Sequence, residues 1–302
     1  MKEIMVVTGG AGFIGSHLSQ KLLNLGYIVR IIDNLCQGNP DYIPDGAEFY
    51  EGNVLDKDLL KKVFTGAKGV FHMAAMSKVA PSIEKIEYCT EQNVLGTLNV
   101  LLMARECKVQ KVVYSASSSY YGNRQAPQNE EMLPDPLNPY ALSKYVGEQY
   151  CELYTVLYGL PTISLRYFNV YGRRQPSEGA YALVLGIFLK NLKEGKPLLI
   201  HGKGEQRRDF IHVSDIVEAN IAAFKSEAKG MVLNVGSGKN ISIQELADLI
   251  SKDQIYEPRR AGDAEITLAD ISKTKAILNW VPKVSIEEGI QQMIDDTRNG
   301  YL

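Results

Sequence analysis

The sequence has no apolar run that approaches the ~20 residues needed to cross a bilayer. Its N-terminus enters the apolar run Ile4–Val7 at once, without the pattern of a signal peptide. The 33 basic and 35 acidic residues leave a net charge of −2, so no electrostatic attraction to nucleic acid or to an anionic membrane is indicated. We therefore expect a soluble, cytoplasmic protein without nucleic-acid or membrane partners.

Cysteine is also scarce. The four cysteines, Cys36, Cys89, Cys107 and Cys151, contain no pair with CxxC spacing. A zinc site or a redox dithiol built on that motif is therefore not supported. We expect reduced and mostly buried thiols, and no bound metal.

Short apolar runs alternate with helical patterns over the first two thirds of the chain. The runs that we expect to form strands are Ile4–Val7, Val29–Ile32, Phe49–Tyr50, Val70–His72, Val112–Tyr114 and Thr162–Leu165. The ranges that we expect to form helices are 13–25, 57–65, 83–106 and 139–158. Near-continuous apolar strands that alternate with helices predict an α/β fold with a doubly wound parallel sheet of the Rossmann type.

The pattern changes after residue 168, where helices mix with short strands, as in a smaller C-terminal α+β lobe. Two capping boxes, Ser242 to Glu245 and Ser285 to Glu288, predict helix starts there. The range 209–235 reads as a helix and a strand that return to the main sheet. We expect a nucleotide-binding domain of residues 1–168 plus about 209–235, and a substrate lobe of about 169–208 plus 236–302.

Three glycines open the first predicted helix, in Thr8-Gly9-Gly10-Ala11-Gly12-Phe13-Ile14-Gly15. In this pattern Gly9 permits a tight turn, Gly12 lets the backbone approach a pyrophosphate, and Gly15 lets the helix pack closely on the sheet. The start of the helix, with Phe13 and Ile14, offers N–H groups and a positive dipole end to phosphate. The GxxGxxG spacing is one residue wider than the commoner form, so alone it is a weak signal.

Asp33 strengthens the prediction of a dinucleotide site. It ends the next strand, 18 residues after Gly15, where a carboxylate can accept from both hydroxyls of the adenosine ribose and would repel a 2′-phosphate. NAD is therefore favoured over NADP. The other residues that we expect around the cofactor are Asn34, Asn53, Val54, Met73, Ala74, Ala75 and Asn93.

Tyr140 and Lys144 lie one helical turn apart, and of the 17 tyrosines only Tyr140 has a lysine four residues later. An ammonium ~4 Å from a phenol, at an effective dielectric of ~20, contributes roughly 4 kcal/mol, or about three pK units before desolvation. We therefore expect Lys144 to lower the pKa of Tyr140 and to make it a base. A base beside a nicotinamide indicates an enzyme that takes hydride from a carbinol.

At this point the sequence resembles the extended short-chain dehydrogenase/reductases, and among them the UDP-glucose (UDP-galactose) 4-epimerases. The stretches that carry the resemblance are TGGAGFIGSHL, IIDN, NVLGTLNVL, YSASSSYYG, NPYALSKYVGEQ, LRYFNVYG, RRDFIHVSD, RRAGD and ADISK. They extend over nearly the whole chain. The resemblance implies NAD-dependent C4 epimerisation of a UDP-hexose through a 4-keto intermediate, with Ser117, Tyr140 and Lys144 as the catalytic residues.

The resemblance also implies the residues that bind substrate. Asn169 should contact the diphosphate or nearby sugar hydroxyls, while Arg208 and Arg260 should clamp the two phosphates. Asp263 should accept from the uridine ribose, and Tyr181 should lie near the uracil. The paired arginines at 207–208 and 259–260 leave the clamp ambiguous by one position.

Thr267 stands where epimerases of narrow specificity carry a tyrosine that closes the sugar pocket. The threonine leaves room beside the C2 substituent, so we hypothesise that UDP-GlcNAc and UDP-GalNAc are accepted besides UDP-glucose and UDP-galactose. The resemblance further implies a homodimer through helices 83–106 and 139–158. Val94, Leu98 and Leu101 in the first of these ranges are explained equally well by packing on the sheet.

Other reactions in the family fit less well. Dehydratases and UDP-glucuronate decarboxylases carry a glutamate in the serine loop, whereas this chain has Ser118 and Ser119 there, which cannot replace a carboxylate base. UDP-glucuronate 4-epimerases tend to have threonine in place of Asn169. A nucleotide-sugar reductase, an alcohol dehydrogenase and a non-catalytic NAD-binding protein stay open, although the last would usually have lost Tyr140 or Lys144.

Overall fold

The computed structural model describes residues 2–176, 184–258 and 265–299. Its centre is a seven-stranded parallel sheet in the order β11-β6-β5-β4-β1-β2-β3. The strands are β1 (Ile4–Thr8), β2 (Ile28–Asp33), β3 (Glu48–Glu51), β4 (Ala67–His72), β5 (Lys111–Ser117), β6 (Thr162–Tyr167) and β11 (Met231–Val235). All six expected strands are present, and the doubly wound parallel sheet is confirmed.

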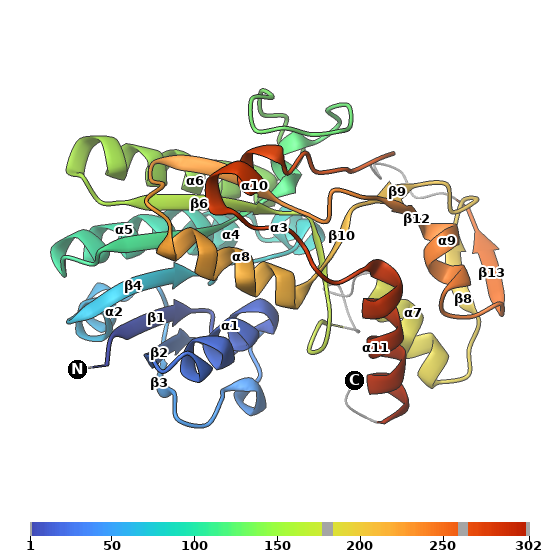
Figure 1. Cartoon of the computed structure of the whole chain (residues 1–302), viewed down its shortest axis with the longest axis horizontal. Coiled ribbons are helices and arrows are strands. Elements are labelled where there is room, and N and C mark those ends of the chain that lie inside the picture. Colours follow the sequence, from blue (N-terminus) through green and yellow to red (C-terminus); the bar gives the residue numbers. More distant parts are fainter. Residues whose placement is uncertain (1, 177–183, 259–264, 300–302) are drawn as a thin grey trace.

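Helices cover both faces of this sheet (Figure 1). They are α1 (Phe13–Asn24) and α8 (Val213–Lys225) on one face, and α2 (Lys57–Phe64), α5 (Gly96–Glu106) and α6 (Pro139–Tyr158) on the other. Each face has its own apolar core: Leu18 and Ile216 pack with the first pair of helices, and Leu60, Leu101 and Cys151 with the second group. Alternate strand residues supply both cores, which explains why the strands read as continuous apolar runs.

The expected helix over 83–106 is wrong in one respect, because the chain there is divided. It forms α3 (Val79–Glu84), α4 (Ile86–Thr90), a π-helical turn (Glu91–Leu95) and then α5. Lys85 leaves the helical region, with φ −128° and ψ 58°. Inside the π-helical turn, the Asn93 side chain bonds both backbone groups of Met76. This long-range contact fixes the irregular turn, and the local sequence pattern carries no sign of it.

The second lobe has a separate apolar core that includes Phe188, Leu246 and Met293. Its elements, with the strands that link it to the sheet, are β7 (Asn169–Tyr171), α7 (Val184–Lys193), β8 (Leu198–His201), β9 (Arg207–Arg208), β10 (Phe210–His212), β12 (Ile241–Ser242), α9 (Ile243–Asp248), β13 (Gln254–Glu257), α10 (Ser272–Leu278) and α11 (Ile286–Arg298). Both predicted capping boxes are present, at α9 and α11. The strand expected near 231–235 joins the sheet as β11, beside β6.

α6 lies unusually close to β5. Its first turn is set by Pro139 and by the Asn138 side chain, which accepts from the Ala141 N–H, and it ends at Gly159 in the left-handed region. Along its length, a Cβ on Gly147 would lie 2.2 Å from the Tyr114 hydroxyl oxygen of β5. Glycine at this position therefore lets the helix that carries Tyr140 approach the strand that ends in Ser117.

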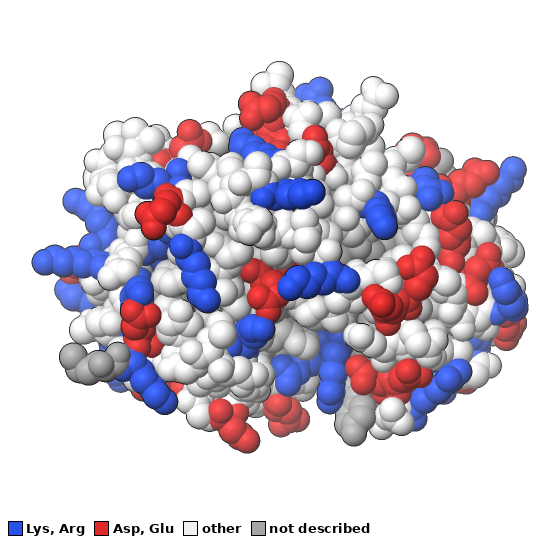
Figure 2. Space-filling model, in the orientation of Figure 1, with Lys and Arg blue, Asp and Glu red and all other residues white. Residues whose placement is uncertain are grey.

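The surface agrees with the small net charge. On the face in Figure 2, basic and acidic side chains alternate without a large patch of either sign. Among the described residues, no helix combines the length and the apolar character that crossing a membrane requires.

His72 at the end of β4 generates a prediction about acid stability. Its ring bridges Thr8 Oγ1 (2.7 Å) and Thr97 Oγ1 (3.0 Å), and burial, with a smaller effect of Lys144, lowers its pKa to about 3. An unfolded chain protonates histidine near ~6.5. Between these values only the unfolded state takes the proton, so stability falls as the pH falls through this window.

At about pH 5 this difference should destabilise the fold by about 2 kcal/mol relative to neutral pH. In the His72→Gln variant an amide can still bridge the two threonines, and we expect a smaller loss between about pH 7.5 and 5 in urea unfolding. An equal pH dependence in both proteins would contradict the assignment.

Candidate functional site

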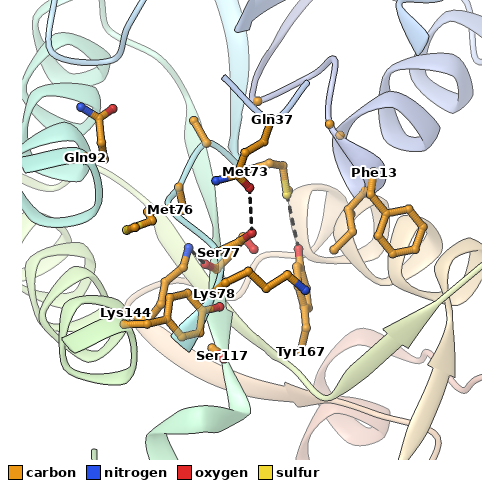
Figure 3. Close-up of a pocket in the computed structure, with 18 of the residues that line it drawn as sticks. Phe13, Gln37, Met73, Met76, Ser77, Lys78, Gln92, Ser117, Lys144 and Tyr167 are labelled. Atoms are coloured by element: carbon orange, nitrogen blue, oxygen red, sulfur yellow. Dashed lines mark hydrogen bonds between the residues drawn. The ribbon is translucent and has the colours of Figure 1, made fainter. Parts of the chain in front are cut away.

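An elongated cavity of about 740 Å³ lies at the carboxyl ends of the strands. In parallel α/β sheets this edge is where ligands bind. The predicted site residues that line it are Gly9, Gly12, Phe13, Ile14, Gly15, Asp33, Asn34, Asn53, Val54, Met73, Ala74, Ala75, Ser117, Tyr140, Lys144, Asn169 and Thr267. The structure therefore brings together the glycine-rich turn, the serine loop and the Tyr140–Lys144 pair. Figure 3 shows Phe13, Ser117 and Lys144 around this space.

The glycine-rich turn has the geometry that a dinucleotide requires. Gly9 has a φ of +72°, and a Cβ there would lie 2.8 Å from the Ala74 nitrogen. A Cβ on Gly15 would lie 2.1 Å from the Gly9 carbonyl oxygen, so α1 can reach the turn only because this residue is glycine. The first turn of α1 leaves its N–H groups without partners inside the helix, and Gly12 adds no capping side chain. These residues fit a pyrophosphate at the helix start.

Asp33 is nearly buried at the end of β2. Its two carboxylate oxygens accept from the Ala11 N–H (3.0 Å) and from the Leu35 N–H (2.9 Å). Burial raises the pKa of Asp33, and these two backbone bonds oppose the rise. Each oxygen keeps a further lone pair toward the cavity. The residue is therefore both a turn anchor and an acceptor that fits ribose hydroxyls.

Asn53 faces the same end of the cavity. Its amide oxygen accepts from the Leu55 N–H at 2.9 Å. A contact of this oxygen with the cofactor would therefore share the oxygen with the backbone.

Ser117, Tyr140 and Lys144 come from β5 and from the first turns of α6. The Ser117 hydroxyl lies close enough to the Tyr140 phenol to lower its pKa. Lys144 donates to the Ser115 carbonyl at 2.7 Å and lies with its Nζ 5.0 Å from the centre of the Tyr114 ring. Burial lowers the pKa of Lys144 to about 8. The three predicted catalytic side chains thus share one wall of the cavity.

The expected effect of Lys144 on Tyr140 is not found. Burial raises the pKa of Tyr140, and the group that opposes this rise is the Ser117 hydroxyl. The physical reason is that the same burial that brings the two side chains together also penalises both charged forms. The Lys144 ammonium is turned to the Ser115 carbonyl, so Ser117 is the group that stabilises a phenolate here.

Ser119 also belongs to this arrangement. Its backbone N–H and its hydroxyl both bond Ser117 Oγ, at 3.2 and 2.9 Å. With two donors on the Ser117 oxygen, the Ser117 proton is left to point to Tyr140. Ser119 therefore fixes the direction in which Ser117 donates. The run of serines contains this residue, but the sequence alone does not select it from its neighbours.

Asn169 and Thr267 also line the cavity and contact each other. Asn169 Nδ2 donates to the Asp209 carbonyl (3.1 Å) and to Thr267 Oγ1 (3.3 Å). Both amide protons are therefore used, and the amide oxygen is left as an acceptor. An acceptor suits a sugar hydroxyl and does not suit a phosphate oxygen, so of the two contacts expected for Asn169 the geometry favours the sugar hydroxyls over the diphosphate.

Some predicted residues lie elsewhere. Asn93 does not line the cavity; its side chain lies behind the wall and joins Met76 to Ser143 Oγ of α6, at 2.9 Å. Arg208 is on β9 outside the cavity, and its Nη1 donates to the Arg207 carbonyl at 2.9 Å. Tyr181, Arg260 and Asp263 lie outside the described residues.

The cavity also contains residues that sequence reasoning missed. Gln37 and Ser77 meet across it at 3.3 Å, and Tyr167 reaches Met73 Sδ at 3.7 Å (Figure 3). Lys78 lies beside them in the same lining. The sequence feature that these residues share is their place in the chain, because each one ends or closely follows a strand of the parallel sheet.

Comparison with known proteins places this geometry in context. Residues 5–236 match the model of the NAD dependent epimerase/dehydratase family. The chain is 35% identical to the UDP-glucose 4-epimerase of Thermotoga maritima, solved with UDP-glucose, with a TM-score of 0.95 over 99% of this chain and 100% of that one. It is 33% identical to the UDP-N-acetylglucosamine 4-epimerase of Methanobrevibacter ruminantium, solved with UDP-N-acetylmuramic acid (TM-score 0.94; 99% and 100% covered).

A third similar structure is the UDP-glucuronic acid 4-epimerase of Bacillus cereus, solved with UDP-glucuronic acid and NAD. It is 31% identical, with a TM-score of 0.90 over 99% of this chain and 100% of that one. Relatives at similar distances therefore carry three different sugar specificities.

Ser119 generates a prediction for catalysis. In Ser119→Ala the Ser117 hydroxyl loses a donor that fixes its direction, so the pKa of Tyr140 should rise further. We expect about a fivefold loss of kcat, as for one neutral hydrogen bond, and a shift of the rate–pH profile to higher pH. Ser119→Thr keeps the hydroxyl and should restore both. An alanine variant with an unshifted profile would assign Ser119 a purely structural role.

Proposed function

The chain belongs to the NAD-dependent epimerase/dehydratase family, and we propose that it interconverts the C4 epimers of a UDP-hexose. The observation that carries this proposal is the position of Ser117, Tyr140 and Lys144 in the lining of a cavity that also contains the glycine-rich turn. A hydroxyl group of a substrate can meet the Tyr140 oxygen there, and bound NAD supplies the acceptor and donor of the C4 hydride.

Within this proposal, Tyr140 takes the proton of the sugar 4-hydroxyl and returns it at the end of the cycle. The Ser117 hydroxyl lowers the pKa of Tyr140 and so stabilises the phenolate while the proton is away from the phenol. Lys144 holds its ammonium at the Ser115 carbonyl, within the same wall, where it can also bond the ribose of the nicotinamide half. Asn169 offers its amide oxygen to a hydroxyl of the hexose.

The lining of the cavity supports epimerisation over elimination of water. Among the described residues, no glutamate lines the cavity, and Asp33 is its single aspartate. Asp33 lies at the end expected to bind adenosine. Removal of a C5 proton would need a carboxylate beside Ser117, where the chain has Ser118 and Ser119.

The sugar pair that we propose is UDP-glucose and UDP-galactose, with the acetamido sugars as further substrates. UDP-glucuronate epimerisation and a net reductase of the same fold are the alternatives. We keep Arg208, Arg260, Asp263 and Tyr181 as proposed contacts of the nucleotide half of the substrate. A location in the cytoplasm and the division of the chain into two domains also remain proposals that rest on the sequence.

We also propose a homodimer through α6 and the segments before α5. Leu142, Leu153 and Val156 of α6 are exposed and recur on one side of the helix, and Ile83 and Ile86 are exposed nearby. Leu101, in contrast, is completely buried in the core with α2. The molecular mass of the protein in solution tests this proposal: twice the mass of the chain would support the homodimer, and the mass of one chain would contradict it.

The test of the function is turnover without added cofactor. Purified protein should equilibrate UDP-glucose with UDP-galactose when no NAD is added, because each cycle regenerates the cofactor. Tyr140→Phe should lower kcat at least ~100-fold, the usual contribution of a positioned base, while bound NAD is retained. Consumption of added NADH with a keto sugar, without epimer formation, would instead support the reductase.

Thr267 provides the test of the acetamido hypothesis. Its side chain lines the cavity and bonds Asn169 and the Asp209 N–H, so a larger residue at this position would narrow the space near the sugar. In Thr267→Tyr we expect kcat/KM for UDP-GlcNAc to fall at least ~10-fold relative to UDP-glucose. Unchanged acetamido-sugar activity would reject the pocket explanation.

A further inference from the structure

Lys78 is a cationic side chain at the catalytic end of the cavity. It is the last residue before α3, and Ser82 Oγ of α3 accepts the Tyr140 N–H at 3.1 Å. The lysine therefore emerges where α3 meets the first turn of α6. Figure 3 shows its side chain extending into the cavity, from the loop that also carries Ser77 toward Tyr167.

The described residues offer this ammonium no counter-ion. Asp33 is the carboxylate in the described lining, and its oxygens bond Ala11 and Leu35 at the end that fits adenosine. Lys144, the other lysine of the lining, is held by the Ser115 carbonyl. No acceptor for Lys78 occurs in the part of the chain that the structure describes, and burial lowers its pKa to about 8. The Lys78 side chain is half-buried, and a partly desolvated cation without a partner is costly, so a ligand group that compensates it would bind well here.

The anionic groups of the expected ligands differ in where they lie. The pyrophosphate of the cofactor fits the start of α1, at Gly12 and Phe13. An oxidised nicotinamide is itself positive and would not attract a second cation. A neutral hexose has no charge to offer, and the diphosphate of the substrate is expected at Arg208 and Arg260. The group that fits an ammonium beside the Tyr140 end of the cavity is an anion carried by the hexose itself.

We propose that Lys78 binds a carboxylate on the hexose ring, so that the site accepts UDP-hexuronates such as UDP-glucuronate. This inference rests on the proposed function, since it places the hexose at Tyr140. It adds no chemical step, because the carboxylate is bound and unchanged while C4 is oxidised and reduced. Lys78 is thus a specificity residue, and an ammonium that meets a carboxylate away from water gains more than a neutral hydrogen bond.

The test compares two substrates in three variants. For the wild type, kcat/KM is measured with UDP-glucuronate and with UDP-glucose, without added NAD. In Lys78→Met the ratio of the first to the second should fall about 30-fold, as expected for a lost charge-assisted hydrogen bond. Lys78→Arg keeps the charge and should keep most of the ratio. Lys85→Met removes an exposed lysine at the other end of α3 and should leave the ratio unchanged.

Three other outcomes would contradict either the role of Lys78 or the proposed function. Equal losses for both substrates in Lys78→Met would overturn the proposal, because they would place the lysine at the shared diphosphate or at the cofactor. A wild type that epimerises UDP-glucose and not UDP-glucuronate would also overturn it and leave the proposed function intact. If neither sugar is turned over, the proposed function fails, and calorimetric Kd values for the two nucleotide sugars then decide the role of Lys78: equal Kd ratios in wild type and Lys78→Met would reject it.

Discussion

The close approach of α6 to β5 is the constraint on which the site depends. Gly147 permits it, since a Cβ there would lie 2.2 Å from the Tyr114 hydroxyl oxygen. Lys144 then reaches the Ser115 carbonyl at 2.7 Å, and the phenol of Tyr140 reaches Ser117. Behind the wall, Asn93 ties Ser143 of the same helix to the loop after β4. Three elements far apart in the chain thereby present the reactive groups on one surface.

This packing has an electrostatic consequence. Burial disfavours the charged forms of both Tyr140 and Lys144: the pKa of the phenol rises, and that of the ammonium falls to about 8. The charges that line the cavity also differ between its two ends. Asp33 lies at the end that fits adenosine, and two lysines lie at the other end. Charges of opposite sign at the two ends help to orient a dinucleotide and a nucleotide sugar within one groove. Ser117, oriented by Ser119, stabilises the Tyr140 phenolate where that anion would form.

The sequence predicted the strands, α6 and many of the residues that line the cavity, because these features rest on local patterns. Apolar periodicity determines the strands, and the Tyr140–Lys144 spacing on a regular helix determines which side chains face together. The division of the helix over 83–106 was not predictable, since the contact of Asn93 with Met76 joins residues that no local pattern relates. The position of Lys78 and the raised pKa of Tyr140 likewise depend on the tertiary structure. Arg208 lies outside the cavity in this structure. Its proposed contact is with the nucleotide half of the substrate, so the structure without substrate does not contain that contact.

The measurement that tests the account most directly is the fate of the hydrogen on C4. A UDP-hexose that carries deuterium at C4, epimerised by the protein in ordinary water, should give a product that keeps the deuterium at C4, because the hydride is removed and returned within one closed cycle. Loss of the label to solvent would mean that C4 exchanges a proton with a base during the reaction. That result would contradict a mechanism in which Tyr140 acts on the hydroxyl alone.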